Sequence, residues 1–201
     1  MKIKILIPVF NDWQSLSKLL NNIDNEVQNI NHEISVIIVD DASTFDRQLE
    51  TADLSNINSV KILVMKENRG HARCIAAGLK YILEKEEFDY VIPMDGDGED
   101  RPEEIKEFIK TIENNPNKTI VGERVKRSEA FIFKLCYFFH KLITLVFTGH
   151  SIKFGNFTCL SKSTVEKLIS EKATWNNFSG ALTKVEKNKI SIPSIRGERY
   201  F

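Results

Sequence analysis

The sequence has few cysteines, no excess of charge of either sign and no long uncharged run. Its 201 residues include three cysteines, Cys74, Cys136 and Cys159, at wide spacings and without a CxxC pair. A disulfide scaffold and a zinc finger are therefore excluded, and reduced thiols in a cytosolic protein are expected. Lysine plus arginine and aspartate plus glutamate both number 28, so the formal net charge is zero. A general electrostatic grip on nucleic acid is not expected at this charge balance.

Secretory and membrane-spanning segments are lacking as well. The N-terminus, MKIKILIPVFND, has only a short apolar stretch and no small-residue cleavage site, so it does not resemble a signal peptide. No stretch of about 20 residues is free of charge, so no transmembrane helix is expected. The nearest candidate, residues 130–148, is interrupted by Lys134, His140 and Lys141. With 42% apolar residues, the chain is expected to form one globular domain.

Short apolar runs alternate with amphipathic patterns through the first part of the chain. Helices are predicted after Asp12, over 71–85 and after Pro102, where apolar residues recur at three- and four-residue steps. Gly78, inside the second helix, predicts close packing of that helix on a sheet. The alternation predicts parallel βαβ units in a three-layer α/β/α fold with a mostly parallel central sheet. Its buried strands are predicted at 3–9, 34–39, 60–65, 90–94 and 118–121.

An acidic pair and an acidic run follow two of these strands. The pair is Asp40 and Asp41, and the run begins at Asp95. Ligands of open α/β sheets bind beyond the carboxyl ends of the strands, so both clusters fall where a site is expected. Asp95, Asp97 and Glu99 alternate along the chain, which places three carboxylates on one side of an extended backbone. Oxygen ligands of this kind suit Mg²⁺ or Mn²⁺ rather than zinc, and such ions are usually shared with substrate phosphates.

Acidic residues at strand ends also occur in proteins of different function. Receiver domains gather aspartates there, but their acidic pair follows the first strand, where this chain has PVFN at positions 8–11. Sugar-nucleotide nucleotidyltransferases usually carry a Gly- and Arg-rich loop after that strand, which this segment does not supply. A solvated acidic turn before Pro102, and an ordinary turn after Asp41, are the simplest alternatives to a ligand site.

Four segments, in order, resemble a known family. ILIPVFND, IIVDDAS, ENRGHARCIAAGLKYI and YVIPMDGDGEDRPEEI are similar to the nucleotide-sugar domain of family 2 glycosyltransferases with the GT-A fold. The resemblance is closest to the dolichol- and undecaprenyl-phosphate sugar transferases, and it resumes at GNFTCLSKSTVEKL and in the tail IPSIRGERYF. It implies a single glycosyltransferase domain over 1–201, with a nucleotide-sugar and metal half at 1–125 and an acceptor half at 126–201.

The resemblance also implies roles for individual residues. Those beside the nucleotide would be Pro8, Asn11, Asp40, Asp41, Asn68 and Gly70. Asp95 would touch the sugar, the metal or the acceptor, while Asp97 and Glu99 would hold Mg²⁺ or Mn²⁺ on the diphosphate. Close relatives often have Gln in place of Glu99. Arg124 matches an arginine near the active centre, and Arg199 matches one that faces phosphate groups; a surface role is the alternative for both.

The acceptor side departs from the family pattern. Relatives that glycosylate a hydroxyl usually use a late Asp as general base, and this chain has no Asp after Asp100. Glu166 and Glu171 lie in a predicted helix, where a solvated face explains them. The segment FGNFT at 154–158 lacks the Asp or Ser before it and the Arg after it that close relatives carry. A phosphate acceptor is already anionic and needs no strong base, so the pattern favours a polyprenyl phosphate.

The Phe-rich stretch 130–148 predicts a helix that lies at a membrane surface, with core or dimer packing as the alternative. The combined expectation is a metal-dependent, inverting family 2 glycosyltransferase of hexosyltransferase type, at the cytoplasmic face of the membrane in cell-envelope biosynthesis. Its donor would be a UDP- or GDP-sugar. A glycan hydroxyl in surface polysaccharide synthesis is the alternative acceptor, and a catalytically silent nucleotide-sugar binding module is the alternative function. A homodimer, and a longer gene product, are left open.

Overall fold

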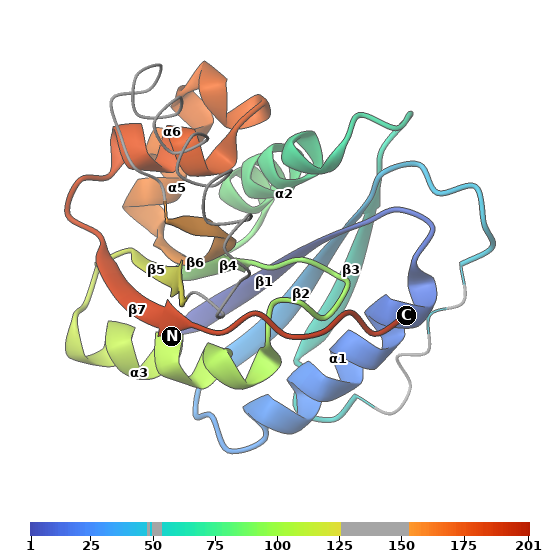
Figure 1. Ribbon diagram of the computed structural model, residues 1–201, viewed down its shortest axis with the longest axis horizontal. Helices are drawn as coiled ribbons and strands as arrows, with labels where there is room; N and C mark the ends of the chain where they lie inside the picture. Colours follow the sequence, from blue (N-terminus) through green and yellow to red (C-terminus); the bar gives the residue numbers. More distant parts are fainter. Residues whose placement is uncertain (48, 50–53, 126–152) are drawn as a thin grey trace, which may run out of the picture.

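The computed structural model describes residues 1–47, 49, 54–125 and 153–201. Within these ranges one sheet of seven strands has the order β3-β2-β1-β4-β6-β5-β7 (Figure 1). β6 pairs antiparallel with both of its neighbours, whereas the other described pairs are parallel. The strands are β1 (Lys2–Val9), β2 (Glu33–Asp40), β3 (Ser59–Val64), β4 (Tyr90–Pro93), β5 (Ile120–Arg124), β6 (Phe154–Ser161) and β7 (Ile190–Ser194).

Helices cover both faces of the sheet (Figure 1). α1 and α3 pack on one face, while α2, α5 and α6 pack on the other. The predicted three-layer α/β/α fold with a mostly parallel central sheet is therefore confirmed. The helices are α1 (Trp13–Val27), α2 (His71–Lys85), α3 (Ile105–Asn114), α5 (Lys162–Ser170) and α6 (Phe178–Val185), with short 3₁₀ turns η1 (Pro102–Glu104) and η2 (Lys172–Trp175).

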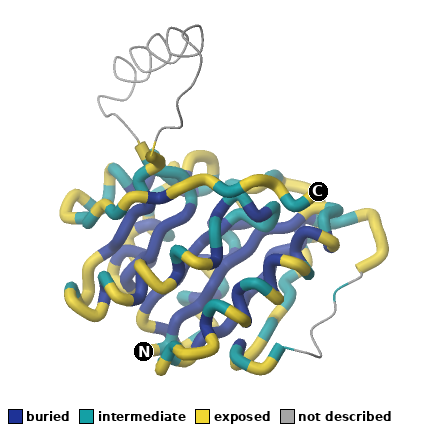
Figure 2. Tube along the Cα trace, turned by 60° about the horizontal axis from the view of Figure 1, so that its bottom comes forward, coloured by how far each residue is buried: buried dark blue, intermediate teal, exposed yellow. Residues whose placement is uncertain are grey.

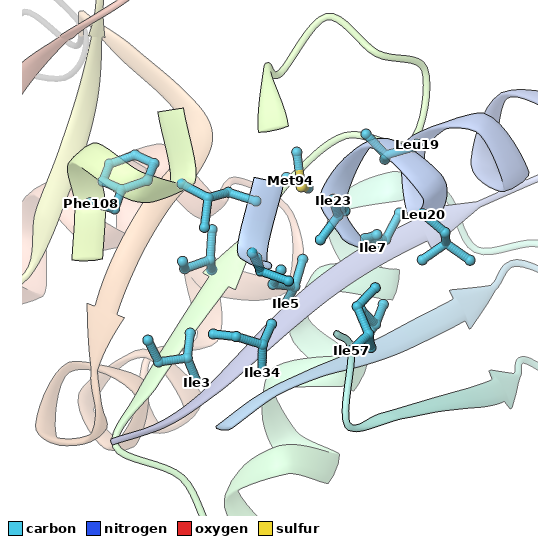
Figure 3. Packing of buried hydrophobic residues seen from close by; sticks show 14 of the residues in the cluster. Ile3, Ile5, Ile7, Leu19, Leu20, Ile23, Ile34, Ile57, Met94 and Phe108 are labelled. Atoms are coloured by element: carbon cyan, nitrogen blue, oxygen red, sulfur yellow. The ribbon is translucent and has the colours of Figure 1, made fainter. Parts of the chain in front are cut away.

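The central strand β1 divides the core between the two helical layers. Side chains alternate along a strand, so Ile3, Ile5 and Ile7 face the α1 and α3 side, while Leu6 faces α2. Figure 3 shows the part of the core on the α1 and α3 side, with Phe108 of α3 at one end and Leu19 of α1 at the other. Figure 2 shows the buried strands running through the middle of the molecule. This continuous core fixes the strand ends that carry the acidic residues.

Local sequence signals explain several element boundaries. Asp12 caps α1 by accepting a hydrogen bond from the amide of Ser15 at 3.3 Å, and α2 has the predicted bounds. Pro102 opens η1, directly before α3. A Cβ at Gly78 would lie 2.3 Å from Cδ1 of Leu6, which confirms the close packing of α2 on β1.

Three expectations need correction. The fifth predicted strand is displaced to Ile120–Arg124, and β6 separates it from β4. β6 and β7 had no strand prediction, since β6 begins with a Gly-containing stretch of mixed polarity and β7 is a short edge strand with Pro193. The helix predicted after Asp12 was expected to reach Ile30, because apolar residues recur at helical spacing as far as that position, but α1 ends at Val27.

Two further expectations concern cysteines and membrane segments. Cys74 and Cys159 are free and buried, while Cys136 lies outside the described residues. The stretch 130–148 also lies outside them, so its predicted membrane-surface helix is not described. Among the helices that are described, none has the length and apolar character needed to cross a membrane.

Candidate functional site

A pocket of about 340 Å³ opens beyond the carboxyl ends of β1 and β4. Its position is the one that open α/β sheets favour for ligands. A larger depression of about 900 Å³ lies at the opposite edge of the sheet, among the amino ends of β1 and β2, away from both acidic clusters. The smaller pocket is therefore the better candidate for the functional site, because it is the one next to the acidic residues. It is lined by Pro8, Val9, Phe10, Asp12, His71, Asp95, Gly96, Asp97, Asn156 and Arg199.

The loops that follow β1 and β2 are joined through Asn11, and Asp40 shapes the second of them. Asn11 has a positive φ of 57°, and its Oδ1 accepts hydrogen bonds from the amides of Thr44 at 2.7 Å and Phe45 at 3.1 Å. Oδ1 of Asp40 accepts the amide of Ser43 at 2.9 Å. Asn11 and Asp40, two of the residues predicted beside the nucleotide, therefore use these side-chain oxygens to shape the loop at 43–45, which forms one rim of the site.

Asp41 ties the same rim to the start of α2. Its buried carboxylate accepts hydrogen bonds from the amides of Arg69 at 2.7 Å and Gly70 at 2.8 Å. Gly70 adopts a φ of 86°, a conformation that favours glycine, where the chain enters α2. Asn68 is exposed just before this turn. Of the six residues predicted beside the nucleotide, Pro8 alone is a lining residue of the pocket, and contact of any of them with a nucleotide remains a prediction.

Asp95 is held by side chains from two distant elements. Nε2 of His71 lies 3.0 Å from its Oδ1, and Nδ2 of Asn156 donates to the same oxygen at 3.2 Å. Burial raises the pKa of the Asp95 carboxyl, but the contacts with His71 and Asn156 outweigh it and leave that pKa below its ordinary value. The hydrogen bond to Asp95 conversely raises the pKa of the His71 imidazole. Asp95 is therefore an oriented, ionised carboxylate at the pocket wall.

Two more carboxylates crowd against Asp95. Oδ2 of Asp100 accepts the backbone amide of Asp95 at 2.8 Å. Burial, together with the charge of Asp95, raises the pKa of Asp100 to about 7. The same two causes raise the pKa of Asp97 above its ordinary value. This turn therefore concentrates negative charge and favours cations beside it.

Arginines supply positive charge from two sides. Nε of Arg199 lies 3.1 Å from Oδ2 of Asp97, and Arg196 forms an ion pair with Glu99. From the other side comes Arg124, at the end of β5, whose charge lowers the pKa values of Asp95 and Asp100 against the effect of burial. Of the two predicted arginines, Arg199 therefore contacts the acidic turn, whereas Arg124 acts on it through its charge.

The oxygen ligands fit a divalent ion that is shared with phosphate groups. Asp95 and Asp97 both line the pocket, and one or two carboxylates commonly suffice for Mg²⁺ when phosphates complete its shell. Glu99 is directed toward Arg196 and does not line the pocket. Over the ranges that the structure describes, no three His, Cys, Asp or Glu side chains are gathered into a ready metal cluster. The metal role of Glu99 stays a prediction.

Sequence reasoning missed His71, Asn156 and Arg196. His71 directly follows the Asn68-Arg69-Gly70 turn, so the predicted start of a helix at the carboxyl edge of the sheet could have placed it near Asp95. Asn156 lies in the GNF segment, but only the antiparallel pairing of β6 with β4 brings that segment to the pocket. Arg196 had no signal beyond its nearness to Arg199.

Comparison with known proteins defines the class. The family model described as Glycosyl transferase family 2 matches residues 4–156. The chain therefore belongs to family 2 of the glycosyltransferases, an assignment that agrees with its α/β fold and with the acidic turn at the sheet edge.

Particular relatives lie in the branch that the resemblance indicated. The chain is 33% identical over 127 residues to "Dolichol-phosphate mannosyltransferase" of Pyrococcus furiosus, covering 63% of this chain and 34% of that protein. It is 27% identical over 164 residues to "Undecaprenyl-phosphate 4-deoxy-4-formamido-L-arabinose transferase" of Proteus mirabilis, covering 81% of this chain and 48% of that protein. The chain thus spans half or less of the length of these two relatives.

A solved structure confirms the fold. The mannosyltransferase PcManGT from Pyrobaculum calidifontis, in complex with GDP-Man and Mn²⁺, superposes with a TM-score of 0.62 at 18% identity, covering 98% of this chain and 56% of that one. S. aureus TarS in complex with UDP-GlcNAc gives a TM-score of 0.64 at 14% identity, covering 100% of this chain and 60% of that one. The fold is thus the GT-A fold of these glycosyltransferases.

Proposed function

We propose that this family 2 glycosyltransferase moves a sugar from a nucleotide-diphosphate donor to a polyprenyl phosphate, with inversion at the anomeric carbon and with a divalent ion. The observation that carries the proposal is the pocket at the sheet edge, where Asp95, Asp97 and Arg199 meet in a chain of this family. Supporting it, two relatives are named for dolichol-phosphate and undecaprenyl-phosphate transfer, and a structural neighbour binds GDP-Man and Mn²⁺.

On the donor side, the nucleoside of a UDP- or GDP-sugar would lie over the rim beyond β2 and its diphosphate would lie over the acidic turn. The rim residues proposed to form the nucleoside site are Pro8, Asn11, Asp40, Asp41, Asn68 and Gly70. Mg²⁺ or Mn²⁺ would be held by Asp95 and Asp97, with Glu99 as a third carboxylate. When bound, the ion would neutralise charge that builds up on the leaving diphosphate.

The reaction is a single displacement. An oxygen of the acceptor phosphate attacks the anomeric carbon on the side opposite the diphosphate. The new carbon–oxygen bond forms as the bond to the β-phosphate oxygen breaks, and the electron pair departs on that oxygen as the nucleoside diphosphate. Arg124 and Arg199 stabilise the phosphate charges, because guanidinium groups bind phosphate in a bidentate manner. No proton has to be removed, which agrees with the missing late Asp.

A glycan hydroxyl acceptor is the second candidate. It needs a general base, and the ionisable side chains that line the pocket among the described residues are already engaged: His71 contacts Asp95, Asp97 pairs with Arg199, and Asp12 caps α1. Glu171 does not serve, since it pairs with Lys184 of α6 and does not line the pocket. The described site therefore suits an anionic acceptor better.

A donor screen by calorimetry tests the first half of the proposal. UDP- and GDP-sugars are titrated with Mn²⁺ or Mg²⁺ into the protein, Asp97→Asn and the control Glu166→Gln, which removes an exposed carboxylate on α5. Metal-dependent binding that is lost only in Asp97→Asn is expected, and the preferred base is identified. Absence of binding by any donor to the folded protein would contradict the proposal.

An acceptor assay tests the second half. Labelled donor is incubated with undecaprenyl phosphate or dolichyl phosphate, with the matching polyprenol that lacks the phosphate, and with a surface-polysaccharide fragment as the glycan acceptor. Transfer to the phosphates alone is expected, with product of inverted anomeric configuration by NMR. Transfer to a glycan instead would favour the second candidate, and donor binding without any transfer would indicate a silent binding module.

A lipid acceptor would place the enzyme at the cytoplasmic face of a membrane. This location, the peripheral contact through 130–148 and a homodimer remain predictions from the sequence. Co-sedimentation of the protein with vesicles of phosphatidylglycerol and phosphatidylcholine, with and without undecaprenyl phosphate, checks the membrane contact. Protein that stays in the supernatant with every vesicle would contradict it.

A further inference from the structure

The last seven residues, Ile195–Phe201, form the C-terminal segment, which follows the acidic turn closely. The amide of Gly197 donates to the carbonyl of Glu99 at 2.8 Å, and the amide of Tyr200 donates to the carbonyl of Asp97 at 3.0 Å. Figure 1 shows the segment, in red, leaving β7 and running past the loop after β4 toward α1. These two backbone hydrogen bonds fix the position of the C-terminal segment along the acidic turn.

Ring packing anchors the far end of the segment. The hydroxyl of Tyr200 accepts a hydrogen bond from Nδ2 of Asn22 at 2.8 Å, and Nζ of Lys18 lies 4.6 Å from the Tyr200 ring centroid. Gly98 has a φ of 88°, and a Cβ there would lie 2.7 Å from the Tyr200 ring. The ring therefore uses space that only glycine leaves open at the middle of the acidic turn.

Two arginine side chains of the segment pair with carboxylates of the acidic turn. Arg196 pairs with the carboxylate of Glu99, whose side chain is only 17% exposed. Nε of Arg199 reaches both Oδ2 of Asp97 at 3.1 Å and Oε1 of Glu99 at 3.5 Å. The proposed function assigns these same carboxylates to a divalent ion. Two arginine side chains of the chain therefore contact the groups that would bind the ion.

We propose that Arg196 is a positioning residue that docks the C-terminal segment on Glu99, and that the docked segment competes with the divalent ion for the acidic turn. This inference rests on the proposed function, because it takes Asp97 and Glu99 as ion ligands. The guanidinium groups and the ion share one set of carboxylates, so ion binding weakens the Arg196–Glu99 and Arg199–Asp97 pairs. Arg199 then turns to the diphosphate, which is the anion that the ion brings with it.

Ion affinity without nucleotide tests the competition. Mn²⁺ is titrated by calorimetry into the full chain, Arg196→Gln, and the control Arg101→Gln, which removes a neighbouring guanidinium that pairs with Glu103. Arg196→Gln is expected to bind Mn²⁺ about twofold to fivefold more tightly, the scale of one lost ion pair, while Arg101→Gln stays near the parent. Equal affinity in parent and Arg196→Gln, or an equal rise in both variants, would overturn the proposal.

Hydrogen exchange of the C-terminal segment gives a second readout that does not depend on turnover. Mn²⁺ alone is expected to speed exchange at the amides of Gly197 and Tyr200, and added nucleoside diphosphate is expected to slow it again. Unchanged exchange with saturating Mn²⁺ would overturn the competition.

Asp97→Asn separates the two proposals. If it abolishes Mn²⁺ binding while Arg196→Gln changes nothing, the inference fails and the proposed metal site stands. If the parent and every variant bind no Mn²⁺, the metal part of the proposed function fails, and the competition fails with it.

Discussion

His71 and Asp95 connect the first residue of α2 to the turn after β4, with Nε2 of His71 3.0 Å from Oδ1 of Asp95. Asn156 donates to the same oxygen from β6. Three segments far apart in the sequence therefore fix the direction of one carboxylate. Because both contacts use Oδ1, the orientation of the carboxylate toward the pocket depends on these two donors.

Two replacements of His71 distinguish the contribution of its hydrogen bond to activity from the contribution of its size. His71→Phe removes the donor and should lower kcat/KM about 10-fold to 100-fold, the usual scale for groups that orient a metal ligand. His71→Gln retains an N–H donor of similar reach and should recover most of the activity. Steady-state kinetics with both variants make the measurement. Equal losses in the two would show that the imidazole acts by something other than this hydrogen bond.

Asp24 should stabilise the fold at neutral pH. Its buried carboxylate accepts hydrogen bonds from the amides of Asn56 at 2.8 Å, Ile57 at 2.9 Å and Ser55 at 3.3 Å, joining α1 to the chain before β3. Asp24→Asn should lower the free energy of unfolding at pH 7 by about 1–3 kcal/mol. Urea unfolding of the parent and the variant measures this difference.

The pH dependence of that difference has a definite sign. Burial raises the pKa of Asp24, but the amide hydrogen bonds outweigh it, so its folded pKa lies below its ordinary value. The stabilisation is fully present above the unfolded pKa of about 3.9 and is lost as pH falls through the lower folded value. The parent and Asp24→Asn should therefore differ equally at pH 6 and 7 and converge only in acid. A difference that grows in acid would contradict this account.

Lys4 and Glu86 form a nearly buried ion pair at the α2 side of the sheet. Their charged atoms are 3.4 Å apart, and their side chains are 7% and 8% exposed. Glu86→Gln leaves the Lys4 ammonium without its counter-charge and should cost about 3 kcal/mol, because a buried charge is then uncompensated. Lys61→Gln removes the exposed partner of Glu86 and should cost much less than Glu86→Gln, because solvent screens an exposed pair. Thermal unfolding compares the two, and similar losses would contradict the assignment.

Gly78 and Leu6 should be energetically coupled. Alanine at position 78 suits a helix, but its Cβ would lie 2.3 Å from Cδ1 of Leu6, so overpacking should make Gly78→Ala destabilising by about 1–3 kcal/mol. In a Leu6→Val background the clash is relieved and the penalty should shrink. A double-mutant cycle of unfolding free energies measures the coupling. Additive effects would mean that the helix shifts as a whole.

The first half of the fold could be predicted because its signals are local. Apolar runs indicated β1 to β4, and Asp12 and Pro102 marked helix starts. The position of the acidic turn followed from the rule that parallel strands expose their carboxyl ends at one edge. The fold class was predicted on this basis and the family on the resemblance of the ordered segments, and both are confirmed.

The rest of the site depends on long-range pairing that no local pattern shows. Insertion of β6 beside β4 brings Asn156 to Asp95, and the return of the chain after β7 brings Arg196 to Glu99. Neither contact has a periodic or spacing signal. For the same reason, Asn11 and Asp41 were predicted beside the nucleotide on resemblance, while their hydrogen bonds to loop amides emerged only from the folded chain.

The pairing of β5 with β6 has a consequence for the length of the connection between them. The amide of Arg124 donates to the carbonyl of Lys153 at 3.1 Å, so the described chain leaves the sheet and rejoins it at adjacent points (Figure 2). An insert whose ends already touch adds little closure entropy when its length changes. A change in the length of the connection between Arg124 and Lys153 should therefore leave the acidic turn, its arginines and the sheet in place.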